Sequence, residues 1–155
     1  MSSTGDAAGD VTAGVRDGGC VCGAVRYRAG LPALWIAHCH CSMCRRAQGA
    51  GFVTWVGIAE NKFQLLAGTE ALEHYRSSPS ATRSFCRRCG SPLLFRSSRW
   101  PGETHVTLAS LDDPAGLEPG AHVYWSSRAS WSDWSGRELQ AIDLPDHDAP
   151  STSAS

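Results

Sequence analysis

The hydrophobic and polar positions of the chain follow one another in short runs separated by Gly, Pro and Ser. Over residues 24–30 apolar and polar side chains alternate, and the run ends at a Gly-Leu-Pro turn. Runs of this length, bounded by turn residues, are typical of β-strands. The pattern therefore predicts a mainly β domain, with further strands at residues 33–41, 51–58, 63–68, 72–78, 82–86, 92–98, 105–111 and 122–127.

One segment favours a helix instead. Residues 41–49, with the sequence CSMCRRAQG, contain no β-branched residue, end in a glycine and are followed closely by a second one, Gly51. Ser42 is the predicted N-cap, because a serine hydroxyl can accept a hydrogen bond from the first helical turn. Gly49 or Gly51 is the predicted end of the helix.

The two ends of the chain have little that could pack into a core. Residues 1–17 are rich in Gly, Ala, Ser, Thr and Asp, and residues 146–155 have a similar composition. We expect both to be disordered tails around one domain at residues 18–145, since a chain of 155 residues suits a single domain.

Charge and hydropathy exclude several classes of partner. The chain has 14 Lys and Arg against 15 Asp and Glu, so no basic excess favours nucleic acid. No apolar run approaches the length needed to cross a bilayer. The N-terminus has neither the basic region nor the apolar core of a secretory signal. We therefore expect a cytoplasmic protein that binds neither membranes nor nucleic acids.

Seven cysteines are the main chemical signal, and in a reducing compartment clustered thiols favour metal binding over disulfides. The motif CRRCG has the form of a zinc knuckle, in which glycine permits a positive φ and backbone N–H groups approach sulfur. One such motif provides two ligands. The glycine-flanked CVC near the N-terminus is suited to provide the others, which predicts a structural zinc at Cys20, Cys22, Cys86 and Cys89.

The segment HCHCSMC adds Cys39, Cys41 and Cys44, hereafter the cysteine triplet. In an extended chain Cys39 and Cys41 point to one face and the two neighbouring histidines to the other, and a turn can then return Cys44 to the same point. Structural zinc sites usually have four protein ligands, whereas catalytic sites keep one open position. The triplet therefore predicts a three-thiolate zinc with a place for substrate.

Other interpretations of these residues stay open. The triplet can be a second structural site completed by a histidine or by a different pairing with Cys86 or Cys89, or it can have a redox role. His74, His105 and His122 are expected to be core or surface residues rather than ligands. Trp125, Trp131 and Trp134 are candidates for the wall of a pocket.

In combination, GGCVCGAVRY, CHCSMCRRAQGAGF, FCRRCGSPL and LDDP followed by HVYWSSRASW resemble the glutathione-dependent formaldehyde-activating enzyme family, also called the CENP-V/GFA domain family. The resemblance runs from about Gly18 to Pro145. It implies a Mss4-like (β-tent) zinc-binding fold with two zinc ions per chain. It also assigns Cys20, Cys22, Cys86 and Cys89 to a structural site, and the triplet to the second site.

The activity that the resemblance implies is that of a carbon–sulfur lyase. Such an enzyme joins formaldehyde and glutathione to give S-hydroxymethylglutathione, so the expected partners are a small thiol and an aldehyde. Arg45 and Arg46 are candidates to bind the carboxylates of a glutathione-like thiol, because a guanidinium binds carboxylate bidentately. A solvent-exposed helix face is the other interpretation of these arginines. The competing functional class is a non-catalytic thiol carrier or binding module.

Overall fold

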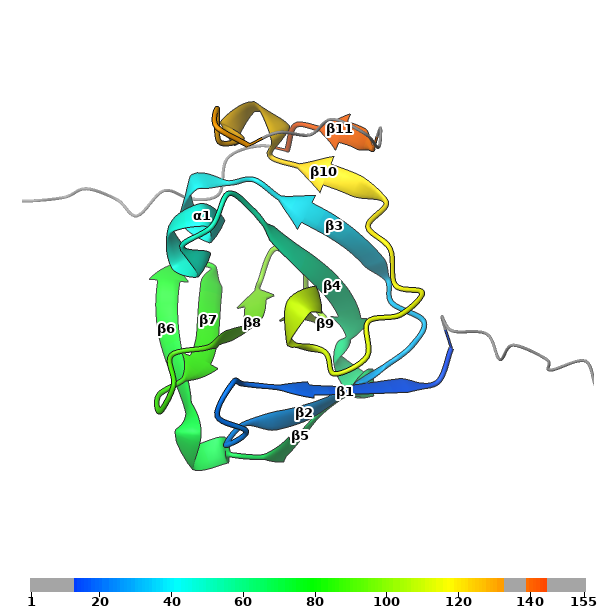
Figure 1. Cartoon of the computed structure of the whole chain (residues 1–155), viewed down its shortest axis with the longest axis vertical. Coiled ribbons are helices and arrows are strands. Elements are labelled where there is room, and N and C mark those ends of the chain that lie inside the picture. The colour runs from blue at the N-terminus through cyan, green and yellow to red at the C-terminus, as the bar shows by residue number, and fades with distance from the viewer. Residues whose placement is uncertain (1–12, 133–138, 145–155) are drawn as a thin grey trace, which may run out of the picture.

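The computed structural model describes residues 13–132 and 139–144 of the chain. Trp134 and most of the two expected tails lie outside the described residues. Two β-sheets form the body of the protein (Figure 1). The small sheet has the order β1-β2-β5, with strands at Val15–Gly19, Arg26–Gly30 and Phe63–Ala67.

The large sheet has eight strands in the order β11-β10-β3-β4-β9-β8-β7-β6. Most neighbours are antiparallel, but β10 is parallel to both β3 and β11. In Figure 1 this sheet curves around the small one, from β6 beside its edge to β11 at the far end. In that order the strands are Gln140–Ile142, Ala121–Val123, Trp35–Cys39, Val53–Ala59, Glu103–Thr107, Pro92–Ser97, Ala81–Cys86 and Leu72–Ser78.

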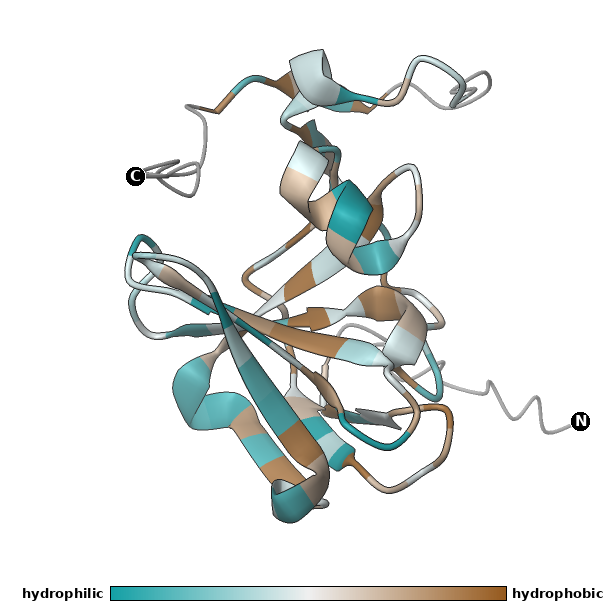
Figure 2. Ribbon diagram, turned by 90° about the vertical axis from the view of Figure 1, so that its left-hand side faces the viewer, coloured by the Kyte–Doolittle hydropathy of each residue, from teal (hydrophilic) through white to brown (hydrophobic). Residues whose placement is uncertain are grey.

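The large sheet buries apolar side chains on both faces, because its central strands have apolar residues at consecutive positions. Val56 and Leu94 face the small sheet and pack with Tyr27 in the main core. Their neighbours Trp55 and Phe95 point to the opposite face and join a second cluster with the cysteine triplet. Figure 2 shows the corresponding apolar bands along the strands. The triplet thus lies on the face of the sheet that the small sheet does not cover.

The single α-helix of the described residues, α1, spans Ser42–Gln48. The predicted N-cap was wrong: Cys41 takes that position, and its sulfur accepts a hydrogen bond from the backbone N–H of Cys44 at 3.2 Å. Ser42 is exposed, so its hydroxyl has water as an alternative partner. The predicted end is confirmed, since Gly49 adopts the left-handed conformation at the C-cap.

The expected mainly β, Mss4-like fold with one short helix beside the triplet is confirmed. Two local expectations need correction. Strand β1 begins at Val15, inside the segment assigned to the N-terminal tail, and an ion pair between Asp17 and Arg28 joins it to β2. Residues 108–110 form a 3₁₀ turn rather than the end of a strand. No helix of the described residues is long and apolar enough to cross a membrane.

The remaining 3₁₀ turns are short connections. They follow β4, precede β6 and follow β10, at Glu60–Lys62, Thr69–Ala71 and Trp125–Ser127.

Candidate metal centres and the adjoining cavity

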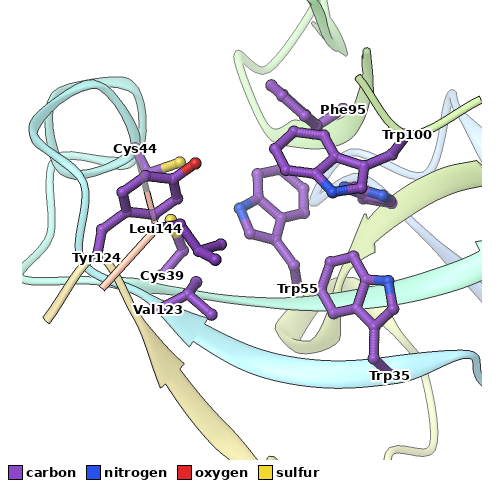
Figure 3. A pocket seen from close by; sticks show the side chains of 10 residues that line it. Trp35, Cys39, Cys44, Trp55, Phe95, Trp100, Val123, Tyr124 and Leu144 are labelled. Carbon is purple, nitrogen blue, oxygen red and sulfur yellow. The ribbon is translucent and has the colours of Figure 1, made fainter. Parts of the chain in front are cut away.

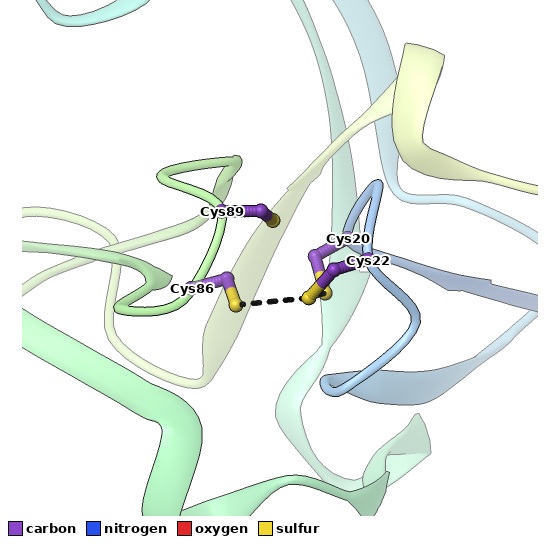
Figure 4. Close-up of side chains that lie close together, drawn as sticks. All are labelled: Cys20, Cys22, Cys86 and Cys89. Carbon is purple, nitrogen blue, oxygen red and sulfur yellow. Dashed lines mark hydrogen bonds between the residues drawn. The ribbon is translucent and has the colours of Figure 1, made fainter.

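The two cysteine motifs near residues 20 and 86 meet in one cluster (Figure 4). Cys20 and Cys22 lie in the turn after β1, and Cys86 and Cys89 lie at the end of β7 and in the turn that follows. All four sulfurs lie within 4.8 Å of one another, with 3.5 Å between Cys20 and Cys22 and 3.8 Å between Cys22 and Cys86. Tetrahedral zinc with Zn–S bonds of about 2.3 Å separates its sulfurs by about 3.8 Å, so this geometry fits a four-thiolate zinc.

Tight turns form this cluster. Gly90 has a φ of 77°, and its N–H donates to the Cys86 carbonyl at 2.7 Å. On the opposite side the N–H of Val25 donates to the Cys20 sulfur at 3.2 Å. Such N–H···S bonds orient a thiolate ligand. The cluster joins the small sheet to the large one, because Cys20 and Cys22 follow β1 and Cys86 ends β7.

The cysteine triplet forms a second cluster at the junction of β3 and α1. Cys39 ends β3, Cys41 caps the helix and Cys44 lies in its first turn, and all three are buried. Their sulfurs lie within 4.8 Å of one another. Three thiols at this spacing can hold a soft metal ion such as zinc. Within the part of the chain that the structure describes, no histidine or carboxylate shares this spacing with them.

The histidines of the same segment point away from the triplet, as the alternation along the strand predicts. His40 Nε2 lies 2.9 Å from His122 Nδ1, and His38 Nδ1 lies 2.8 Å from the Thr54 hydroxyl. Trp125 packs edge-on against His40, with ring centroids 5.1 Å apart. These side chains form a packed cluster of their own on the other face of β3.

Arg83, on β7, contacts the triplet and was missed by the sequence analysis. Its Nη1 and Nη2 groups donate to the Cys44 sulfur at 3.6 and 3.5 Å, and its guanidinium lies over the Phe95 ring. Hydrogen bonds from the thiols of Cys39 and Cys41 lower the pKa of Cys44 well below its usual value, and Arg83 lowers it further. Nothing in the local sequence RSF marks this arginine, because its partner is 39 residues away.

A cavity of about 230 Å³ opens beside the triplet (Figure 3). Cys39, Cys44 and Tyr124 lie along one side, and Trp35, Trp55 and Trp100 lie along the other. The remaining lining residues are Phe95, His105, Val123 and Leu144. The predicted pocket tryptophans Trp125 and Trp131 are therefore not among those that line this cavity.

Among the described residues that line the cavity, His105 is the one with a basic side chain. Its ring is 3% exposed, and its Nε2 is 2.8 Å from the Glu103 Oε2 atom. Trp35 donates its Nε1–H to the same oxygen at 3.0 Å. Burial lowers the pKa of His105, and the Glu103 carboxylate partly opposes that effect. The ring is thus a neutral imidazole near pH 7, fixed in place by a carboxylate.

The position of Trp35 depends on a glycine across the sheet. Trp35 pairs with Gly57 of β4, and a Cβ at residue 57 would lie 2.4 Å from the indole ring. The missing side chain lets the ring lie flat on the strand and reach Glu103. Gly57 therefore supports the position of the carboxylate that holds His105.

Tyr124 enters the cavity from a strained backbone conformation. Its φ of 56° is the one positive value among the described non-glycine residues. Such strain at a bulky residue is found mostly at functional sites. Burial raises the pKa of Tyr124 to about 12, so the side chain stays a neutral phenol.

The predicted carboxylate-binding arginines lie outside this cavity. Arg45 Nε donates to the carbonyl of His40 at 3.3 Å. Arg46 is exposed and lines a second, more open groove of about 650 Å³ together with Tyr75 and Arg83. Trp55 lines both the groove and the cavity, so the two hollows share a wall.

Comparisons with known proteins agree with this architecture. The sequence profile of the glutathione-dependent formaldehyde-activating enzyme family matches residues 15–127. The chain belongs to this family. Its members include a Halomonas elongata protein named as a glutathione-dependent formaldehyde-activating enzyme, which is 28% identical over 129 residues covering 79% of this chain and 82% of the relative.

Two further relatives extend the comparison. An uncharacterized lyase of Schizosaccharomyces pombe is 30% identical over 84 residues, which cover 51% of this chain and 56% of the relative. The crystal structure of a Rhodobacter sphaeroides protein aligns with a TM-score of 0.55 at 29% identity, covering 66% of this chain and 91% of that one. This chain therefore shares the fold of that crystal structure.

Proposed function

We propose that the chain is a zinc-dependent carbon–sulfur lyase that joins a small thiol to an aldehyde at the cysteine triplet. The observation that carries this proposal is that Cys39 and Cys44 line a cavity. An ion held by the triplet would have three protein ligands and face that cavity, whereas the four-cysteine cluster has a full ligand set. An open position is the mark of a catalytic zinc site.

Zinc at the triplet would lower the pKa of a bound thiol, so that it is available as thiolate near neutral pH. Three thiolates around a Zn²⁺ ion would carry a net charge of −1 at a buried position. Arg83 offsets this charge through its contacts with the Cys44 sulfur. A zinc ion held by three thiolates would be a weaker Lewis acid than one held by three neutral histidines, which favours thiol capture over water activation.

His105 is placed to move the proton of the reaction. Its Nε2 is engaged by Glu103, so Nδ1 is the nitrogen that remains for a substrate. In the forward direction the thiol proton passes to Nδ1 while the sulfur electron pair forms the new C–S bond. The π electrons of the carbonyl move to oxygen, which then takes the proton back from His105. The reverse sequence releases aldehyde and thiol, and no oxidant or reductant is needed.

The polar part of a glutathione-like thiol fits the second groove better than the cavity. Arg46 is exposed there and available to a carboxylate, with Arg83 on the same wall. Arg45 points its Nε to the His40 carbonyl and supports the loop before α1. We therefore assign carboxylate binding to Arg46 first, with Arg45 in a secondary role.

The test is the rate of exchange between formaldehyde, glutathione and their adduct, measured by NMR exchange spectroscopy with and without protein. We expect the protein to accelerate exchange and Cys44→Ser to abolish the acceleration. A protein that binds glutathione without any acceleration would instead be a thiol carrier, and the proposed lyase activity would be wrong.

A further inference from the structure

The cavity beside the triplet is much larger than formaldehyde requires. Its volume is about 230 Å³, whereas a water molecule takes about 30 Å³ of liquid and an apolar cavity of about 150 Å³ binds benzene. A carbonyl compound with two heavy atoms would leave most of this space to water. The size suits a carbonyl that carries a ring.

The walls of the cavity have the chemistry of an aromatic-binding site. Five of the ten lining residues are Trp, Tyr or Phe, and Val123 and Leu144 add aliphatic surface. Among the described residues, no Lys, Arg, Asp or Glu lines it, so these walls offer no partner for the carboxylates of glutathione. Burying an unpaired carboxylate there would be costly, which leaves the apolar space to the other substrate.

The reacting groups lie along the same walls. Cys39 and Cys44 are on one side, and His105 is held among Trp35, Phe95 and Trp100, with ring centroids 4.5 to 5.8 Å away. A ring in this space would therefore place an attached carbonyl between the triplet and the imidazole. The tryptophans would stack on the ring in the offset or edge-on arrangements that aromatic pairs prefer.

We propose that the carbonyl substrate of this chain is an aromatic aldehyde, whose ring occupies the cavity while its carbonyl meets the thiol at the triplet. This inference rests on the proposed function and names the substrate class of the same site.

Binding is tested first with benzyl alcohol, an unreactive analogue, by isothermal titration calorimetry on the zinc-loaded protein. Val123→Phe fills the cavity from β10 and should abolish binding. Trp100→Ala, in the turn after β8, removes one stacking partner and should raise the dissociation constant roughly 2- to 10-fold. Trp131→Ala is the matched control, because that side chain is 73% exposed and does not line the cavity. The proposal would be overturned if Val123→Phe bound benzyl alcohol as tightly as the unaltered protein, or if the unaltered protein did not bind it.

Exchange spectroscopy with glutathione then compares benzaldehyde with formaldehyde. The proposal predicts a lower KM for benzaldehyde than for formaldehyde in the unaltered protein and in Trp131→Ala, and a loss of this preference in Val123→Phe. A preference for formaldehyde would overturn the aromatic substrate and leave the lyase function standing. If benzyl alcohol bound but the protein accelerated exchange of neither aldehyde, both the aromatic aldehyde substrate and the lyase function would be overturned.

Discussion

His105 and Glu103 lie two residues apart on β9, and a 2.8 Å hydrogen bond joins Nε2 of the imidazole to the carboxylate. On the cavity side, the titratable groups that face this pair are Cys39, Cys44 and Tyr124. On the other side, Glu103 shares a surface hollow with Glu60 and Arg96. Trp35, from β3, donates to the same carboxylate and fixes its orientation. The pair is therefore a buried, carboxylate-held base that faces the triplet.

The first prediction concerns the pH dependence of exchange. Because burial lowers the pKa of His105 from 6.5, the base stays neutral and active until the pH falls below that value. The acid limb of kcat/KM should lie below pH 6.5. Glu103→Gln removes the group that favours the imidazolium, so the limb should move to still lower pH. In His105→Asn that limb should disappear with a loss of roughly 10²- to 10⁴-fold in rate. A limb unchanged in His105→Asn would exclude this histidine as the proton carrier.

The second prediction concerns Arg83. Arg83→Met keeps the apolar stem over Phe95 but removes the donors to the Cys44 sulfur. Because groups that support a ligand tune its metal affinity, zinc should bind the triplet roughly 10- to 100-fold more weakly. Competition with a chromophoric chelator measures this. Arg96→Met is the matched control, since Arg96 lies over Phe63 in the same manner and does not contact a cysteine. Equal zinc affinity in Arg83→Met and Arg96→Met would refute the role of Arg83 in supporting zinc at the triplet.

The third prediction separates the two cysteine clusters. Cys86 is fully buried in the main core, and its cluster joins the two sheets. Cys86→Ser should lower the melting temperature sharply, because structural zinc contributes directly to folding free energy. Cys44→Ser should remove one zinc and the exchange activity but leave the circular dichroism spectrum and the melting of the core nearly unchanged. Unfolding of Cys44→Ser would instead make the triplet a structural site.

The fourth prediction concerns recognition of the thiol. Arg46→Ala should raise the KM for glutathione and leave that for 2-mercaptoethanol unchanged, because only glutathione has carboxylates for the groove. We expect the KM for glutathione to rise about tenfold, which corresponds to the loss of about one charge-assisted hydrogen bond. Arg76→Ala, an exposed arginine on β6 that bonds its own turn at Pro79, is the matched control. A parallel rise of KM for both thiols would count against carboxylate binding by Arg46.

The sequence predicted the features that depend on local spacing. The grouping of Cys39, Cys41 and Cys44 follows from strand alternation and one helical turn, and the strands follow from short apolar runs. The features it missed depend on contacts between distant segments. Arg83 reaches Cys44 from another strand, and His105 becomes part of the cavity only because β9 lies next to β4. The N-cap was missed because the inward Cys41 thiol competes with a serine hydroxyl that water can satisfy.

β1 shows the same limit at the chain end. Val15 to Gly19 has little apolar content, so its sequence resembles a tail. Pairing with β2 and the ion pair from Arg28 to Asp17 give it order that composition does not reveal. Of the tryptophans predicted to wall a pocket, Trp125 and Trp131 do not line the cavity and Trp134 lies outside the described residues. Trp35, Trp55 and Trp100 line it instead, and they come from three separate parts of the chain.

The central claim is that the triplet holds zinc with three protein thiolates while a separate four-thiolate zinc stabilises the fold. The most direct measurement is the zinc content per chain of protein purified under reducing conditions, determined by elemental analysis. The account predicts two zinc ions per chain. One zinc ion per chain, retained in Cys44→Ser, would mean that the triplet does not bind metal and would contradict the proposed chemistry.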